Sequence, residues 1–280
     1  MPITLDSLDL RHQLTRKPDE HKGHGGRVLL IGGDDGMVGA IVLSAIASLY
    51  CGAGWVEVGF LANPHPMLIP EHPELMLHDA QSIPLEKANT IAIGPGLGKS
   101  AFATETLKKV LLTNVACVID ADALNLISED SELLSSLKVR EAPTVITPHP
   151  GEAGRLLKMN TSDIQLNREQ ALEKLVELTH AIVVLKGEGT LIASPNHSPE
   201  VCKAGNPGMG SGGMGDTLTG ILAALISQGQ MHKLSAWDAT RLGVELHATA
   251  ADTLVNANTG PIGLTASEVA LEVRRLLNKA

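Results

Sequence analysis

The sequence predicts an α/β protein in which helices cover both faces of one mostly parallel β-sheet. Short apolar runs rich in Val, Ile and Leu alternate with longer runs of helical periodicity along the chain of 280 residues. The short runs carry apolar residues at successive positions, a pattern typical of parallel strands buried on both faces. No linker, repeat or low-complexity segment interrupts the alternation, so we expect a single domain over residues 1–280.

Seven apolar runs have the length and composition of strands. We expect a mostly parallel sheet in which the last of these runs forms a hairpin with the strand before it. The runs are Val28–Ile31, Val56–Leu61, Thr90–Ile93, Val115–Ile119, Thr144–Ile146, Ile182–Leu185 and Leu191–Ala193.

Eight further segments are expected to be helices. One of them raises the question of a membrane, because Met37–Val56 is a run of twenty residues without a charge. This run is rich in Ala, Gly and Ser, and Gly52 and Gly54 interrupt it, which favours a buried helix followed by a strand. The expected helices cover residues 37–51, 100–112, 121–127, 151–158, 163–180, 216–228, 234–256 and 265–278.

Composition and charge exclude several classes of protein. The net charge of −9 argues against nucleic acid as a partner. Hydrophobic residues make up 44% of the chain, but only two Trp, one Tyr and two Phe are present, so the core is expected to be aliphatic. The cysteines Cys51, Cys117 and Cys202 form no C-x-x-C pair, and the N-terminus has no apolar signal region. We therefore expect reduced thiols, a cytoplasmic location and no membrane partner.

The segment Gly205–Asp216 is the strongest functional signal. Six of its twelve residues are glycine, and a helix is expected to follow directly. A glycine-rich turn before a helix leaves backbone N–H groups unpaired, which makes an anion site that the helix dipole reinforces. Asp216 at the end of this segment is placed to accept a proton from a hydroxyl near a bound phosphate. The alternative is a flexible turn with an N-capping aspartate.

Two other phosphate motifs fit this segment poorly. A Walker loop ends in Gly-Lys-Ser or Gly-Lys-Thr, which the chain lacks here. Gly208, Gly210 and Gly213 do match G-x-G-x-x-G, but polar residues and Pro207 precede them instead of a strand. A dinucleotide fingerprint requires that strand, so this match is weak.

Five expected strands end in residues that suit ligand binding. In an open α/β sheet, ligands bind at the carboxyl ends of the strands, where these residues would meet the glycine-rich segment. Each segment alone suits an ordinary turn, but together they predict an active site at one edge of the sheet. The segments are Gly32–Gly36, Gly94–Gly98, Asp120–Asp122, Thr147–Glu152 and Lys186–Thr190.

Each of these residues also has a structural interpretation. His149, between two prolines, is suited to donate to a polar substrate or to cap a helix. Glu152 is either an acid at a helix start or a metal ligand through water. Asp120 and Asp122 are suited to the same metal role, and the alternative for Asp122 is to cap the next helix. Lys186 is suited to bind phosphate, and a surface lysine is the alternative. No metal ligand is assigned from the sequence.

Five motifs together resemble the ADP/ATP-dependent NAD(P)H-hydrate dehydratases of the ribokinase-like superfamily. The resemblance runs from about Lys22 to Leu277, with the motifs in the family's order. Ser211 and Met214 depart from it, since threonines are usual at both positions. The motifs are Lys22–Gly26, Gly94–Gly98, Thr147–Glu152, Lys186–Thr190 and Asn206–Asp216.

The resemblance implies a three-layer α/β/α fold and specific roles for residues of this chain. Asp216 would be the catalytic base, and Ala40, Gly98 and His149 would line the substrate site with it. The nucleotide would be held by Lys186, Gly187, Glu188, Gly189 and Thr190, with Gly215 contacting it through its backbone. The amides of Gly212, Gly213, Met214 and Gly215 would form the anion hole.

The resemblance also implies an activity that repairs damaged nicotinamide cofactors. The expected reaction is ADP-dependent dehydration of the S form of hydrated NADH or NADPH, in which the C6 hydroxyl is phosphorylated and phosphate is then eliminated. ADP or ATP is the expected co-substrate, Mg²⁺ the expected ion on its phosphates, and a homotetramer the expected assembly. Two alternatives remain open: a ribokinase-fold vitamin kinase of the hydroxyethylthiazole or hydroxymethylpyrimidine type, and a non-catalytic module that senses adenylates.

Overall fold

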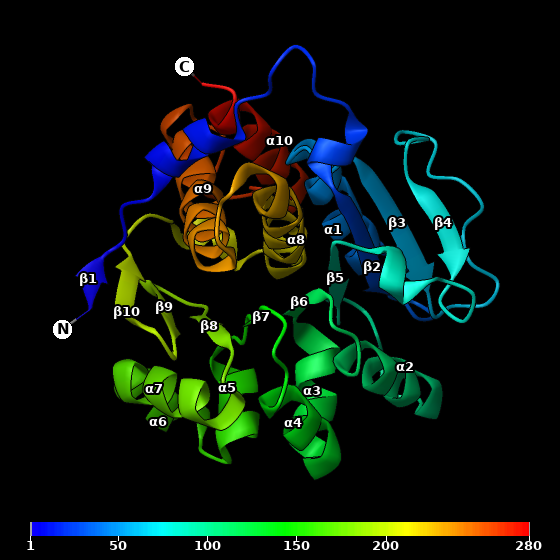
Figure 1. Cartoon of the computed structure of the whole chain (residues 1–280). Helices are drawn as coiled ribbons and strands as arrows, with labels where there is room; N and C mark the ends of the chain where they lie inside the picture. The colour runs from blue at the N-terminus through cyan, green and yellow to red at the C-terminus, as the bar shows by residue number, and fades with distance from the viewer. Residues whose placement is uncertain (1, 280) are drawn as a thin grey trace.

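One ten-stranded sheet forms the centre of the molecule in the computed structural model, which describes residues 2–279 (Figure 1). The strand order is β1-β10-β9-β8-β7-β6-β5-β2-β3-β4. Neighbouring strands run parallel except for β9, which is antiparallel to both β8 and β10, so the expected hairpin is confirmed. The strands are β1 (Ile3–Thr4), β2 (Arg27–Gly32), β3 (Trp55–Phe60), β4 (Met76–Asp79), β5 (Thr90–Ile93), β6 (Ala116–Ile119), β7 (Thr144–Ile146), β8 (Ile182–Leu185), β9 (Thr190–Ser194) and β10 (His197–Cys202).

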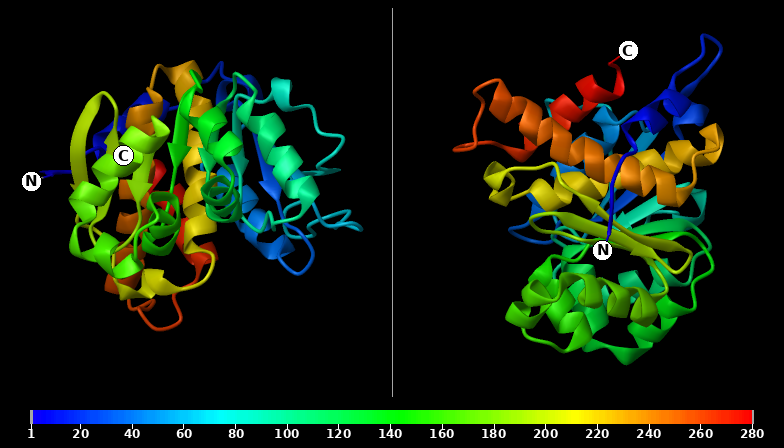
Figure 2. Two further views of the ribbon diagram at one scale, coloured as in Figure 1. Left: turned by 90° about the horizontal axis from the view of Figure 1, so that it is seen from below. Right: turned by 90° about the vertical axis from the view of Figure 1, so that its left-hand side faces the viewer.

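Helices cover both faces of this sheet, as predicted. Figure 2 shows the sheet between two helical layers, one formed by α1 and α8 to α10 and the other by α2 to α7. The described α-helices are α1 (Val38–Tyr50), α2 (Ala101–Leu111), α3 (Ala121–Glu129), α4 (Ser131–Lys138), α5 (Pro150–Leu157), α6 (Thr161–Leu166), α7 (Arg168–Thr179), α8 (Met214–His232), α9 (Ala236–Asn256) and α10 (Ala266–Leu277).

The central strands bury both of their faces, which explains their continuous apolar sequences. Side chains alternate across a strand, so Val28 and Leu30 of β2 join the core under α1, α8, α9 and α10. Leu29 and Ile31 point the other way and join the core under α2 to α7. The predicted aliphatic core is present on both sides, and the three cysteines are buried and free.

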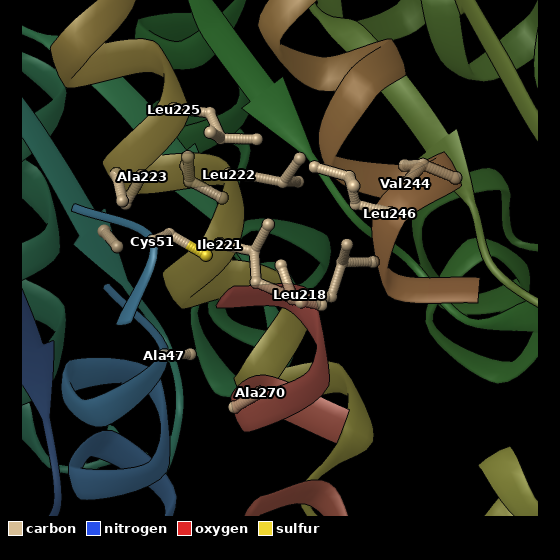
Figure 3. Packing of buried hydrophobic residues seen from close by; sticks show 14 of the residues in the cluster. Ala47, Cys51, Leu218, Ile221, Leu222, Ala223, Leu225, Val244, Leu246 and Ala270 are labelled. Atoms are coloured by element: carbon tan, nitrogen blue, oxygen red, sulfur yellow. The ribbon is translucent and has the colours of Figure 1, made fainter. Parts of the chain in front are cut away.

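Helix α1 is buried within the chain between the sheet, α8 and α10. Figure 3 shows Ala47 and Cys51 facing α8 beside Ala270 of α10. A Cβ added to Gly220 of α8 would lie 2.0 Å from the carbonyl oxygen of Ser44, so glycine is required for this close approach. Packing inside the monomer thus accounts for most of the apolar surface of α1. Among residues 2–279, no helix combines the length and apolarity needed to cross a bilayer.

The structure differs from the sequence expectations in several elements. The expected helix over 163–180 is two helices, α6 and α7, because Asn167 leaves helical geometry with φ −132° and ψ 52°. Helix α4 was not predicted, and neither were the edge strands β1 and β4 or the strand β10 beside β1. The glycine segment contributes a short 3₁₀ turn at Pro207–Gly210, and α8 begins at Met214 rather than at residue 216.

Candidate active site

Residues that follow separate parallel strands meet at one edge of the sheet. Lys186 follows β8 and Asp120 follows β6, and the Lys186 Nζ lies 2.7 Å from the Asp120 Oδ1. Thr219, in the second turn of α8, donates its hydroxyl to the other carboxylate oxygen of Asp120 at 2.8 Å. The Asp120 side chain is only 1% exposed, so these two partners offset the cost of burying its charge.

Lys186 is therefore already paired. Burial lowers the pKa of its amine, but the negative charges of Asp120, Glu152 and Asp216 outweigh burial and leave that pKa raised. The side chain is 18% exposed, which excludes the interpretation as a surface lysine. A Cβ at Gly215 would lie 3.1 Å from the Nζ, so glycine there keeps the first turn of α8 close to this amine. The Lys186 amine is thus a paired positive charge inside the site and not a free cation on the surface.

Asp216 lies in the first turn of α8, close to the ion pair of Lys186 and Asp120. Burial raises the pKa of its carboxyl, repulsion by Asp120 adds to that shift, and Lys186 opposes it, which brings the pKa to about 6. Its backbone carbonyl accepts a hydrogen bond of 2.7 Å from the Ser44 hydroxyl on α1. A carboxyl with this pKa is mostly ionised at neutral pH and still basic enough to take a proton.

The start of α8 leaves amide N–H groups available, as the sequence predicted. Gly213 is the N-cap in the left-handed conformation, with φ +87°. The first intrahelical bond runs from the N–H of Thr217 to the carbonyl of Gly213, and the N–H groups before it are those that an anion binds at a helix start. Space beside Gly212 is open, since an added Cβ would meet no atom within 4 Å.

The two departures from the family's motif have structural roles. The Ser211 hydroxyl lies 2.8 Å from the Gly208 carbonyl and 2.9 Å from the Leu264 carbonyl, so it ties the glycine segment to the loop before α10. The Met214 side chain is 5% exposed and belongs to the core under α8. Residue 214 thus offers its backbone to the site and no side-chain hydroxyl.

His149 and Glu152 form a capping box at the start of α5. The Nδ1 of His149 accepts from the N–H groups of Gly151 and Glu152, and Glu152 accepts from the N–H of His149 at 2.8 Å. The capping role considered from sequence is therefore present. Burial lowers the pKa of His149, and the charges of Lys186 and Arg155 lower it further, which favours the neutral ring. Because Nδ1 accepts a hydrogen bond, the proton of the neutral ring lies on Nε2, 3.3 Å from the Glu152 Oε1.

Glu152 is buried, and burial raises its pKa to about 7, although the charge of Lys186 opposes this shift. Together with Asp120 and Asp216, it places three acids around one amine. Burial is the largest cause of the raised pKa values of Glu152 and Asp216, and repulsion by Asp120 adds to both shifts.

Backbone groups that follow the other strands complete this edge of the sheet. The N–H of Gly98 donates to Asp122 at 3.0 Å, which joins the exit of β5 to the start of α3. Ala40 lies in the first turn of α1, where a Cβ at Gly96 would approach its own Cβ to 3.4 Å. The Ser44 hydroxyl lies one turn further along α1, 3.4 Å from the Ala40 carbonyl, and it contacts the Asp216 backbone as well.

Three residues of this region were missed from the sequence. Thr219 and Ser44 are hydroxyl residues inside helices, a position that gives no functional signal in one sequence. Arg168 of α7 donates to carbonyl groups of the Lys186–Thr190 loop. The Lys22–Gly26 motif, by contrast, lies away from this edge: a Cβ at Gly26 would contact Ser227 near the far end of α8. Its glycines serve packing.

Comparison with known proteins identifies the family. The family model described as NAD(P)H-hydrate dehydratase matches residues 28–274. The chain belongs to this family. A relative in Neisseria meningitidis serogroup B, named ADP-dependent (S)-NAD(P)H-hydrate dehydratase, is 38% identical over 94% of this chain and 89% of its own length.

Other NAD(P)H-hydrate dehydratase relatives are longer. The bifunctional NAD(P)H-hydrate repair enzyme of Coxiella burnetii is 41% identical over 94% of this chain, and the chain spans about half of that relative, 52%. Among solved structures, the ADP/ATP-dependent NAD(P)H-hydrate dehydratase of Bacillus subtilis, co-crystallised with ATP and Mg²⁺, superimposes with a TM-score of 0.85 at 28% identity, covering 99% of this chain and 98% of that one.

The vitamin kinases are similar to this chain in fold alone. A hydroxyethylthiazole kinase from Pyrococcus horikoshii superimposes with a TM-score of 0.62 over 98% of the chain, but only 13% of the residues are identical. The ribokinase-like three-layer architecture is therefore shared, while the family match favours the dehydratase over the kinase.

Proposed function

We propose that the protein is an ADP-dependent (S)-NAD(P)H-hydrate dehydratase, which returns the S form of hydrated NADH or NADPH to NAD(P)H and so repairs the cofactor. The observation that carries the proposal is the Asp216 carboxyl, poised with a pKa of about 6 among the free amides at the start of α8. A base beside an anion site suits proton removal from a hydroxyl that receives a phosphoryl group. The relative that the chain covers to 89% of its length supports the same activity.

In the proposed reaction, Asp216 takes the proton of the C6 hydroxyl while the hydroxyl oxygen bonds to the terminal phosphorus of ADP. The phosphorus–oxygen bond to the rest of the nucleotide breaks, and AMP leaves. The ring nitrogen's lone pair then expels phosphate from C6, and loss of a ring proton restores the dihydropyridine. The amides of Gly212, Gly213, Met214 and Gly215 would stabilise the charge on the transferred group.

We assign the remaining site residues on the same basis. Ala40, Gly98 and His149 would contact the hydrated nicotinamide, and the neutral His149 ring carries the Nε2 proton that such a contact needs. Lys186, Gly187, Glu188, Gly189 and Thr190, with the backbone of Gly215, would hold the nucleotide. Lys186 would contribute a positive charge that is already paired with Asp120.

The donor atoms at this edge fit a magnesium ion that arrives with the nucleotide. No group of three or more His, Cys, Asp or Glu in residues 2–279 is arranged to hold a metal by itself. Mg²⁺ needs only one or two protein carboxylates beside phosphate oxygens and water, and Glu152 would be such a donor. The Glu152 side chain is 5% exposed and burial raises its pKa to about 7, so a bound cation would stabilise its ionised form. A bound ion would neutralise charge on the phosphoryl group.

One assay tests this function. Hydrated NADH is incubated with the protein, MgCl₂ and either ADP or ATP, and absorbance of the reduced nicotinamide at 340 nm is followed. We expect absorbance to return, with one inorganic phosphate and one AMP formed from ADP per NADH. A stable phosphorylated alcohol without NADH would favour a vitamin kinase. Nucleotide binding without turnover would favour a sensing module.

A further inference from the structure

Arg168, the first residue of α7, binds the backbone of the loop between β8 and β9. Its Nη2 donates to the carbonyl of Leu185 at 3.2 Å and to the carbonyl of Gly189 at 3.0 Å. Its Nη1 lies 3.5 Å from the carbonyl of Lys186 and 3.4 Å from the Gln165 Oε1. One guanidinium therefore bridges the two ends of the loop, where a rigid planar group with several donors is needed.

The loop is shaped around this guanidinium. A Cβ at Gly187 would lie 2.2 Å from the Arg168 Nη1, and Gly187 itself has φ +137°, so no other residue fits there without strain. The Thr190 hydroxyl donates to the carbonyl of Gly187 at 3.1 Å. The carbonyl of Leu185 at the end of β8 and the loop carbonyls of residues 186, 187 and 189 are thus turned toward protein donors.

The amide groups of the same loop are left without partners. Within residues 2–279, no protein atom accepts a hydrogen bond from the N–H groups of Gly187, Glu188 or Gly189. Unpaired N–H groups in succession bind anions. Because Arg168 binds carbonyl groups of the loop, the amide groups of the loop remain available to a ligand.

Arg168 also brings a positive charge to this loop. Its hydrogen-bond acceptors are neutral oxygens, and none of the ion pairs within residues 2–279 includes it. Burial lowers its pKa and the charge of Glu188 offsets part of that shift, but an arginine stays protonated at any physiological pH.

We propose that Arg168 is a positioning residue for the nucleotide: it fixes the Lys186–Thr190 loop so that the free amides of the loop bind the phosphates or ribose of ADP. The inference rests on the proposed ADP-dependent function. It assigns Arg168 no contact with the reacting atoms, so its loss should weaken nucleotide binding more than the chemical step.

The test compares Arg168→Lys and Arg168→Gln with the wild-type protein. Lysine keeps the positive charge, but its compact ammonium cannot bridge the two carbonyls that the guanidinium bridges. Glutamine removes the positive charge as well. We expect Arg168→Lys to raise the KM for ADP and the calorimetric Kd of Mg·ADP about tenfold, with kcat changed less than about threefold. Arg168→Gln should raise both constants further.

Arg140 supplies a matched control. Its guanidinium is also half-buried and also binds backbone carbonyls, those of Val110, Leu111, Thr113 and Val115, at distances of 2.6–3.0 Å. These carbonyls lie before β6, whereas Asp120 follows it, so Arg140 acts at the opposite end of that strand. Arg140→Lys should lower the melting temperature and leave the KM and Kd for ADP unchanged.

The outcomes separate this inference from the proposed function. Wild-type protein that fails to bind Mg·ADP would overturn both. Wild-type binding that is unchanged in Arg168→Lys would overturn the role of Arg168 and leave the function standing. An equal loss of ADP affinity in Arg140→Lys would show a general effect of destabilisation and would overturn the role too. If Arg168→Gln does not fold, Arg168→Lys alone decides.

Discussion

At the scale of single residues, the site depends on a balance between one amine and three acids, of which Asp120 and Glu152 are buried and Asp216 is partly buried. Asp216 can act as a base only because Lys186 holds its pKa down while burial and Asp120 push it up. The position of each charge therefore sets the protonation of the others, and substitutions at this edge are expected to shift pH profiles as well as rates.

Replacing Asp216 by asparagine should abolish turnover while nucleotide still binds. The substitution removes the base but keeps the shape of the side chain, and loss of a positioned base costs a factor of about 10²–10⁴ in rate. The measurement is the rate of NADH return at 340 nm, beside calorimetric binding of Mg·ADP. A variant with more than half of the wild-type rate would show that another group takes the proton.

Replacing Asp120 by asparagine should move the acidic limb of the pH–rate profile to lower pH. The limb of kcat/KM reports ionisation of Asp216, whose pKa is about 6. Asp120 raises that pKa and Lys186 lowers it, so removal of the Asp120 charge leaves the attraction by Lys186 unopposed and the pKa of Asp216 falls. A limb that stays in place or moves up in pH would contradict this electrostatic account.

Replacing Lys186 by methionine should destabilise the protein strongly. The change leaves the Asp120 carboxylate, 1% exposed, with only the Thr219 hydroxyl. Breaking one side of a buried ion pair costs about 3–5 kcal/mol. Urea denaturation measures the free energy of unfolding, and the double variant with Asp120→Asn should recover part of the loss. A loss without any recovery would mean that Lys186 matters mainly for packing.

At the scale of elements, α1 and α8 connect the core to the site. Ser44 binds the backbone of Asp216, and Ser48 donates to the carbonyl of Gly220 at 2.8 Å, so the spacing of these helices sets the position of the base. A glycine at the crossing permits that spacing, and a larger residue would change it.

Replacing Gly220 by alanine should therefore lower both stability and activity. The new Cβ would lie 2.0 Å from the Ser44 carbonyl oxygen, and overpacking of this kind costs about 1–3 kcal/mol. Gly39 of α1 is the control, because a Cβ there meets no atom within 4 Å. Alanine at 39 should leave stability unchanged or raise it by up to about 1 kcal/mol. Equal effects at both positions in thermal melts would argue against the close crossing.

The elements that the sequence predicted well are those with one dominant physical signal. Continuous apolar runs located the central strands within one or two residues, because burial on both faces leaves no other pattern. Strand β10 was missed because it begins with His197, Ser198 and Pro199, a polar start that the two-residue edge strand β1 does not cover. Helix α4 was missed because it is short and separated from α3 by Asp130 alone.

The candidate site was predictable in its position and not in its contacts. Strand exits and the glycine segment identified Asp120, Lys186 and Asp216, since the carboxyl ends of parallel strands share one edge. The pairing of Lys186 with Asp120, and the bond from Thr219, join residues 66 and 99 positions apart, which no local pattern reports. Arg168 was missed for the same reason, because a guanidinium that binds carbonyls leaves no motif.

At the scale of the whole molecule, the two cores share one sheet, so we propose that residues 1–280 act as a single ribokinase-like domain. The chain carries a net charge of −9 while its proposed substrates are anions. Backbone amides, a paired lysine and a nucleotide-bound cation would together offset that repulsion. A cytoplasmic location, expected from the reduced cysteines, also stays a proposal.

We propose finally that the protein is a homotetramer in which α1 contributes to the contacts. Ala45 is fully buried inside the monomer, so Ala45→Glu should unfold the chain instead of dissociating it. The partly exposed side of α1 carries Val42, Ile46 and Leu49, spaced as one apolar stripe along the helix. Such a stripe suits a symmetric contact between copies of the chain.

Light scattering at micromolar concentration should give four times the chain mass of 29.4 kDa. Ile46→Glu should then yield a smaller, folded species. The glutamate would place a charge in the contact between subunits, whereas in the monomer solvent still reaches position 46. Circular dichroism checks that the fold is kept, and Ala45→Glu serves as the unfolding control. A wild-type monomer would refute the tetramer, and an intact tetramer of folded Ile46→Glu would remove α1 from the interface.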